Sequence, residues 1–103
     1  MKVKVPQKIK ILTHTYDVGF DRKELAAAGT IGLCQHIYSK IIVTDNMPPS
    51  QRNEAFLHEY LHLVERYLIV KLDDSDIDRL AEGIAVLLEN LGVELDWSLI
   101  KEG

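Results

Sequence analysis

The chain has 103 residues, 47% of them hydrophobic and 27% charged, which is typical of one soluble globular domain. Twelve Lys and Arg residues against sixteen Asp and Glu residues give a net charge of -4, so we expect no nucleic-acid partner, because nucleic acids bind basic surfaces. The single cysteine excludes an intramolecular disulfide, and no apolar run reaches the ~20 residues of a membrane span. The charged N-terminus is not typical of a signal peptide, so we expect an intracellular protein with no membrane partner.

The first part of the chain, residues 1–46, is rich in β-formers and alternates polar and apolar side chains with a period of two. Residues 8–12 (KIKIL) are expected to form a half-buried strand. Residues 15–20 (TYDVGF) are its expected partner, with Thr13 and His14 near the turn. This alternation predicts a hairpin at the start of the domain.

The connection after this hairpin is open to two interpretations. Residues 21–29 (DRKELAAAG) fit either a short helical turn or a loop ended by a glycine. Residues 30–36 and 40–44 predict a second hairpin around residues 37–39. Residues 45–49 (DNMPP) then end the β-structure, so we expect a small antiparallel sheet of three or four strands.

A helical period replaces the alternation over residues 50–91. Ser50 is the expected N-cap of a first helix, which runs from Gln51 to about Val70. Apolar residues recur in this helix at i, i+4, i+7 and i+11, which predicts a core-facing stripe. The stripe consists of Leu57, Leu61, Val64 and Leu68.

A second helix is expected after residues 73–75 (DDS), whose carboxylates suit a helix N-terminus, and Gly92 is its expected C-terminal stop. Two long packed helices after a small sheet predict one α+β domain over residues 1–103, with residues 93–103 as a C-terminal tail. The apolar residues at helical spacing in the second helix are Ile77, Leu80, Ala81, Ile84, Leu87, Leu88 and Leu91.

The first helix carries the pattern HExxH, with His58, Glu59 and His62 in its defined positions. Residues i and i+4 lie on one helical face about 5–6 Å apart at Cβ, so both imidazoles can reach one metal ion, and two neutral imidazoles suit Zn²⁺. Glu59 is offset by one residue, where it can take a proton from zinc-bound water as a general base. Two helix histidines that bind no metal are the alternative interpretation.

A catalytic zinc site needs a third protein ligand, with the fourth position open for water or substrate. The second helix offers two carboxylates on one face, Asp78 and Glu82, beside the apolar residues Leu80 and Ala81. Carboxylates next to a core stripe are explained by a metal ion. Without a metal, Asp78 would only favour the helix N-terminus and Glu82 would be solvated. The spacing alone leaves both carboxylates open as ligands.

The runs AFLHEYLH (residues 55–62) and DRLAEGIA (residues 78–85) resemble the zinc peptidases of the ImmA/IrrE type, and more closely their short stand-alone versions encoded by phages and prophages. In that family a helix bearing HExxH is followed by a helix with a pattern like E-x-x-A-N-x-F-A, whose first acidic residue is the third zinc ligand. The resemblance places this ligand at Asp78 and the family's alanines at Ala81 and Ala85. It implies a zincin-like fold of minigluzincin size.

The chain departs from the family pattern at three positions, because Asp78 replaces Glu, Glu82 replaces Asn and Ile84 replaces the aromatic residue. The shorter aspartate requires a closer approach of the two helices, which Gly83 could permit. Glu82 is then expected to accept a hydrogen bond from a ligand histidine and orient its ring. Glu82 as the zinc ligand remains the alternative.

The resemblance implies a zinc-dependent metallopeptidase that hydrolyses peptide bonds of an intracellular protein, such as a regulator, by Glu-assisted attack of zinc-bound water. It also implies a location in the cytoplasm of a bacterial or phage-infected cell. The alternative from another class is a non-catalytic, metal-binding regulatory or interaction protein of phage origin. Fold-level analogy identifies no particular substrate.

If the fold is zincin-like, we expect two further features of its cleft. Residues 40–44 would form its upper edge, where a substrate peptide adds as an extra strand. A side chain that stabilises the oxyanion is also expected, whereas Cys34 and His14 are expected to be structural. The chemically capable candidates for the oxyanion stabiliser are Tyr16, His36, Tyr38, Tyr60 and Tyr67.

The C-terminal tail, residues 93–103, keeps one tryptophan and several aliphatic residues after the last helix. The simpler expectation is that it packs on the body and completes the core. A sharper hypothesis is that it covers the cleft and keeps the enzyme latent, with Asp96 near the metal.

Overall fold

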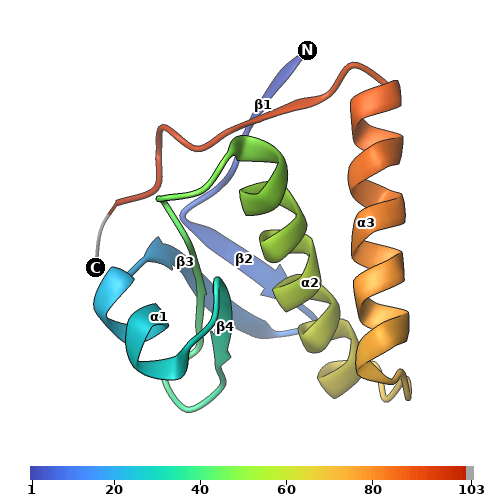
Figure 1. Ribbon diagram of the computed structural model, residues 1–103. Helices are drawn as coiled ribbons and strands as arrows, with labels where there is room; N and C mark the ends of the chain where they lie inside the picture. Colours follow the sequence, from blue (N-terminus) through green and yellow to red (C-terminus); the bar gives the residue numbers. More distant parts are fainter. Residues whose placement is uncertain (102–103) are drawn as a thin grey trace.

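A four-stranded sheet and two long helices form the body of the protein, and the computed structural model describes residues 1–101 (Figure 1). This confirms the predicted α+β class. The strands follow one another across the sheet in the order β2 (Lys8–Ile11), β3 (His14–Phe20), β5 (Lys40–Val43) and β4 (Gly32–Gln35).

Both predicted hairpins are present, but the sheet is mixed and the prediction of an antiparallel sheet is wrong. β2 pairs with β3 and β4 pairs with β5 in antiparallel fashion, whereas β3 and β5 run parallel. The sheet is mixed because the connection after β3 does not place β4 next to β3. β5 then lies between β3 and β4 and pairs with both. Alternation along a strand specifies its buried face and does not specify its neighbours in the sheet.

The segment that the sequence left open forms a short helix, α1 (Arg22–Ala28). The Asp21 side chain caps its N-terminus by accepting a hydrogen bond from the backbone N–H of Glu24 at 3.2 Å. Gly29 ends the helix in the left-handed conformation, with φ of 67°, which glycine adopts without steric cost. The helix therefore has sequence-encoded ends, and it returns the chain to the start of β4.

Helix α2 (Pro49–Tyr67) begins at a proline, so the prediction of Ser50 as N-cap is wrong. Proline is favoured in the first helical turn because it has no N–H to satisfy and its φ is already helical. Figure 1 shows α2 between the strands and the last helix, so it needs two apolar faces. Its predicted stripe is half-buried or exposed, and the deeply buried face is a different one. That face consists of Ala55, Phe56, Glu59 and Leu63.

Helix α3 (Asp74–Asn90) starts with a capping box formed by Asp73 and Asp76. Its buried residues are Ile77 and Ala81, because α3 is an outer layer that packs on α2 (Figure 1). The predicted closer approach at Gly83 is wrong, since a Cβ there would meet nothing within 4 Å. No helix within residues 1–101 is long and apolar enough to cross a membrane. Three residues that were predicted to lie in the core are exposed: Leu80 to 44%, Leu87 to 54% and Leu91 to 66%.

The two ends of the described chain meet in a second, two-stranded sheet, in which β1 (Lys2–Lys4) runs parallel to β6 (Glu94–Asp96). Beyond β6, Trp97 and Ile100 are buried in the main core. The Trp97 ring contacts the Phe56 ring edge-on at 5.3 Å, and its Nε1–H donates to the side-chain oxygen of Asn53 at 2.8 Å. The expectation that the tail completes the core is confirmed for residues 93–101, while residues 102–103 lie outside the described residues.

Candidate metal site

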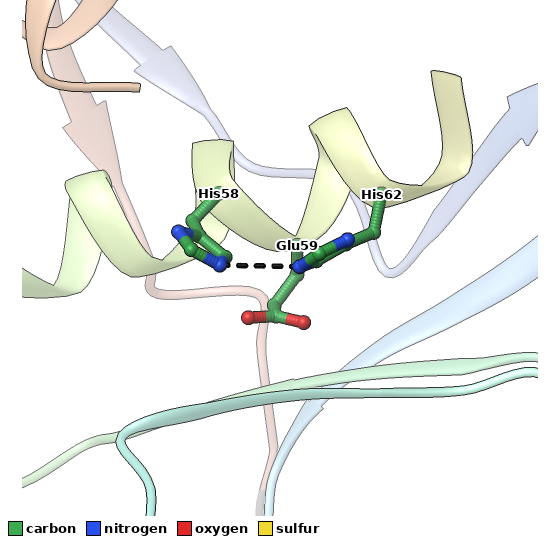
Figure 2. A group of neighbouring side chains, drawn as sticks. All are labelled: His58, Glu59 and His62. Atoms are coloured by element: carbon green, nitrogen blue, oxygen red, sulfur yellow. Dashed lines mark hydrogen bonds between the residues drawn. The ribbon is translucent and has the colours of Figure 1, made fainter. Parts of the chain in front are cut away.

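The two imidazole rings of the HExxH pattern converge in the middle of α2, as Figure 2 shows. The Nε2 atoms of His58 and His62 lie 3.1 Å apart. Two nitrogens bound tetrahedrally at 2.0–2.1 Å to one zinc ion would lie about 3.3 Å apart, so the observed separation fits a shared metal. One ligand atom from each of His58, Glu59 and His62 lies within 4.8 Å of the others, so this group could hold a metal ion.

The outer nitrogens of both rings contact carboxylates. Nδ1 of His58 lies 2.8 Å from an oxygen of Asp78, and Nδ1 of His62 lies 3.3 Å from an oxygen of Glu65. A carboxylate at Nδ1 favours the tautomer with its proton on that nitrogen, which leaves the Nε2 lone pair free for a metal. Each imidazole is thus oriented as a ligating histidine requires. The sequence analysis missed Glu65, whose position three residues after His62 was the available signal.

Asp78 reaches the site because α2 and α3 pack side by side in opposite directions (Figure 1). In the structure its carboxylate occupies the orienting position at His58 that the sequence analysis assigned to Glu82. Glu82 lies one turn further along α3, where it lines a neighbouring cavity together with Glu54. Ligation of the metal by Asp78, or by Glu82 instead, stays a prediction.

Glu59 is the one buried carboxylate of the described chain, with 7% of its surface exposed. Within residues 1–101 no hydrogen bond or ion pair reaches its oxygens, although they lie on the same side of α2 as the two rings (Figure 2). Burial raises the pKa of the Glu59 carboxyl, while the neighbouring His58 and His62 act in the opposite direction. No buried side-chain oxygen or nitrogen of the described residues lacks a hydrogen-bond partner, so the Glu59 oxygens reach solvent although most of the residue is buried. A carboxylate held beside two imidazoles without a protein partner calls for a functional explanation.

Gly32, at the start of β4, makes room for this carboxylate, and the sequence analysis missed its role. A Cβ at this position would lie 3.0 Å from Glu59 Oε2 and 3.3 Å from Glu59 Cγ. The backbone of β4 therefore passes so close to Glu59 that a side chain at position 32 would require Glu59 to shift by a few tenths of an ångström. The signal in the sequence was a glycine inside the strand predicted over residues 30–36, because a glycine in a strand often marks a close approach of the backbone to another group.

A cleft of about 370 Å³ opens beside Glu59. One wall is the chain from Thr30 to Gly32, and the other comprises the exposed side of α2 and the start of α3 at Asp78. β4 pairs only with β5, so it is the edge strand on this side of the sheet. The expectation that residues 40–44 form the cleft edge is wrong, because β5 lies inside the sheet between β3 and β4.

The described part of the tail stays away from this cleft. None of the residues 93–101 lines it, and Asp96 pairs in β-register with Lys4 in the two-stranded sheet. The Asp96 carboxylate accepts a hydrogen bond from the backbone N–H of Ser98 at 2.9 Å. The hypothesis of a latent enzyme with Asp96 near the metal is therefore wrong for the tail up to residue 101.

Three of the five predicted oxyanion candidates form one buried network. The Tyr16 hydroxyl lies 2.8 Å from Nδ1 of His36 and 2.6 Å from the Tyr67 hydroxyl. Burial lowers the pKa of His36, and the charges of Arg66 and His62 lower it further. Tyr38 is 67% exposed and Tyr60 packs against the core, so neither joins the network.

Cys34 lies beside this network, with its sulfur 3.7 Å from Nδ1 of His36. Burial and the nearby Glu59 carboxylate raise the pKa of the Cys34 thiol to about 12. The thiol is protonated near neutral pH and is a poor nucleophile, which agrees with the structural role expected for it.

No protein-family model, no curated protein and no solved structure matches this chain. The resemblance to the ImmA/IrrE type therefore stays a prediction. The geometry of His58, Glu59 and His62 shows a group that could hold a metal ion.

Proposed function

We propose that this protein is a zinc-dependent metallopeptidase, a single zincin-like domain over residues 1–103 in which His58 and His62 hold the metal and Glu59 is the general base. The observation that carries this proposal is a largely buried carboxylate that opens onto a cleft, without a protein partner, beside two convergent Nε2 atoms. A purely structural zinc site needs four protein ligands and no such carboxylate. A hydrolytic site needs both an open coordination position and a base.

The donor set fits zinc. Two imidazole nitrogens, each oriented by a carboxylate at its outer nitrogen, are typical of catalytic zinc sites. We propose Asp78 as the third ligand, with Glu82 as the alternative. If Asp78 instead only orients His58, its removal should weaken zinc binding by about 10–100-fold rather than abolish it.

The chain's own residues supply the proton transfers. Held by His58 and His62, zinc would polarise the substrate carbonyl and acidify a water molecule. Glu59 would accept a proton from the attacking water and pass it to the leaving amine, so that one carboxyl would act first as base and then as acid. A raised pKa suits this double role, because the carboxyl must both take up and release a proton near neutral pH.

The edge strand β4 is the proposed docking site for the substrate backbone. Its outer edge has no partner strand in the described chain, and it passes directly over Glu59 at Gly32. An extended peptide that adds to this edge would form main-chain hydrogen bonds and bring its carbonyl to the metal. We propose a protein or peptide substrate, such as a regulator, in the cytoplasm of a bacterial or phage-infected cell.

Zinc content and peptide hydrolysis together test the proposal. We expect about one zinc per chain, and cleavage of a pool of quenched fluorogenic peptides by the untagged protein. Glu59→Gln should keep the zinc and lower kcat/KM by about 10²–10⁴-fold. The matched control is Glu24→Gln, which removes the same charge on α1, outside the cavities around the metal site, and should retain most of the activity.

Two results would contradict the proposal. A chain that binds no added zinc has no metallopeptidase site. A chain that binds zinc in both forms but cleaves no peptide in either is instead the non-catalytic metal-binding protein, the alternative function.

A further inference from the structure

A second cavity, of about 500 Å³, lies between α2, α3 and the segment that leads into β6. Its apolar lining comes from two elements, with Val86 and Leu88 on α3 and Val93 and Leu95 near β6. We call this cavity the trough. Neither the catalytic groups nor the tail fills it in the described chain, so an exposed apolar lining is left to be explained.

The charged residues that line the trough all have the same sign. They are Glu54 on α2, Glu82 and Glu89 on α3, and Glu94 on β6. Among residues 1–101 no Lys, Arg or His lines it. One cation borders the trough: the Met1 ammonium donates to the backbone oxygen of Gly92 at 2.7 Å and forms no ion pair with any of these four carboxylates. An apolar floor with four carboxylates is complementary to side chains that combine an aliphatic stem with a positive head.

The trough continues from the metal cleft. Glu54 lines both cavities. Along α3, Asp78 in the cleft and Glu82 and Glu89 in the trough stand at i, i+4 and i+11, which places them on one face. Eleven residues of helix span about 16 Å, the length of about five extended residues. Glu59 lines the cleft and not the trough, so what indicates a ligand of the trough is its apolar floor and its four carboxylates.

We propose that the trough binds a basic, extended segment of a peptide, about five residues long, in which Lys or Arg residues alternate with aliphatic ones. This inference rests on the proposed function, because the segment would be the flank of a substrate whose scissile bond lies in the cleft. The stems of the basic residues lie on the apolar floor, and their heads reach the glutamates.

The charges also argue against a second copy of the chain as the occupant. The chain carries a net charge of -4, and pairing of two α3 faces would bring Glu82 and Glu89 of one copy against the same residues of the other. Like charges that face each other across an interface are unfavourable. A basic peptide meets no such repulsion.

Fluorescence anisotropy of a labelled peptide tests the proposal on the full chain carrying Glu59→Gln, so that the peptide stays intact. The probe is Lys-Leu-Lys-Val-Lys-Leu, and the comparison peptide has Gln in place of each Lys. At low salt we expect the basic peptide to bind at least about tenfold more tightly, and the difference to shrink at high salt because exposed charges are screened.

The test variant adds Glu89→Gln and Glu94→Gln, two exposed carboxylates of the trough that lie away from the metal group. We expect it to weaken binding of the basic peptide about tenfold with unchanged zinc content and melting temperature. The control Glu24→Lys makes the same change of two charge units on α1, outside the trough, and should leave binding unchanged.

Equal binding of the two peptides, or no effect of the double variant, would overturn the proposal. Self-association that the double variant alters would identify a second copy as the occupant and would also overturn it. Failure of the two proposals is distinguishable, since peptide binding is measured without turnover. A charge preference in a chain without zinc contradicts only the peptidase, and hydrolysis without a charge preference contradicts only the trough.

Discussion

At the scale of single residues, the buried carboxylate of Glu59 lowers the stability of the fold when it is ionised, although the proposed reaction needs it. Burial raises its pKa in the folded chain above the ordinary value of 4.5, so the folded chain holds this proton more tightly than the unfolded chain does. The contribution of the protonated carboxyl to stability is therefore fully present below about pH 4.5 and is lost as the pH rises through the folded-state pKa.

The first prediction follows from this sign. In the metal-free chain, Glu59→Gln should raise the free energy of unfolding near pH 7 by about 1 kcal/mol, because a neutral amide replaces a buried charge. Near pH 4 the gain should disappear. Urea unfolding at the two pH values, with Glu54→Gln as a half-buried control, measures this effect. Equal gains at both pH values would show that Glu59 carries no charge penalty in the fold.

At the scale of elements, the contact between β4 and α2 decides whether the base can take its place. Gly32 is the only side-chain-free position in β4, and it lies directly against Glu59. An added methyl group would have to displace the carboxylate or the strand, because 3.0 Å is shorter than ordinary van der Waals contact.

We therefore expect Gly32→Ala to lower kcat/KM by about 10²-fold, the cost typical of a small displacement of a catalytic group, while zinc content stays unchanged. Its matched control is Gly83→Ala on α3, where the added Cβ meets nothing and helix propensity should raise stability by up to about 1 kcal/mol. Activity, zinc content and melting temperature of both variants check this. Full activity of Gly32→Ala would mean that Glu59 does not need its observed position.

The elements also show what the sequence could and could not predict. The hairpins and the HExxH face were predictable, because alternation and i, i+4 spacing are local properties. The parallel pairing of β3 with β5 was not, because it depends on how far α1 carries the chain. Leu87 was assigned to the core by its spacing, yet it is exposed, since an outer helix has one packed neighbour rather than two.

In the candidate site too, the features within one helix were predictable from the sequence and the contacts between elements were not. The positions of His58, Glu59 and His62 follow from one helix and were predicted together. The role of Gly32 and the contact of Asp78 with His58 each join two elements that are distant in sequence. Helical periodicity could place Asp78 on a face, but the atom it touches depends on the relative position of two helices.

At the scale of the whole molecule, the core is closed by the C-terminal segment. Trp97 contacts the rings of Phe20 and Phe56 and is hydrogen bonded to Asn53, so it joins the sheet to α2. In a domain of this size a buried aromatic residue carries a large part of the small net stability.

Trp97→Ala should accordingly lower the free energy of unfolding by about 3–5 kcal/mol. The neighbouring change Leu99→Ala, at a side chain that is 39% exposed, should cost about 1 kcal/mol or less. Urea unfolding followed by circular dichroism measures both. A cost for Trp97→Ala no larger than that for Leu99→Ala would show that the segment after β6 is not part of the core.

The pairing of β1 with β6 has a consequence for synthesis. Residues 2–4 find their partner only when residues 94–96 have been made, and Val5 donates its backbone N–H to the oxygen of Asp96. On the ribosome, β1 stays unpaired until the segment that forms β6 has emerged. Chains that stop before β6 would therefore expose an unfinished core to cellular proteases.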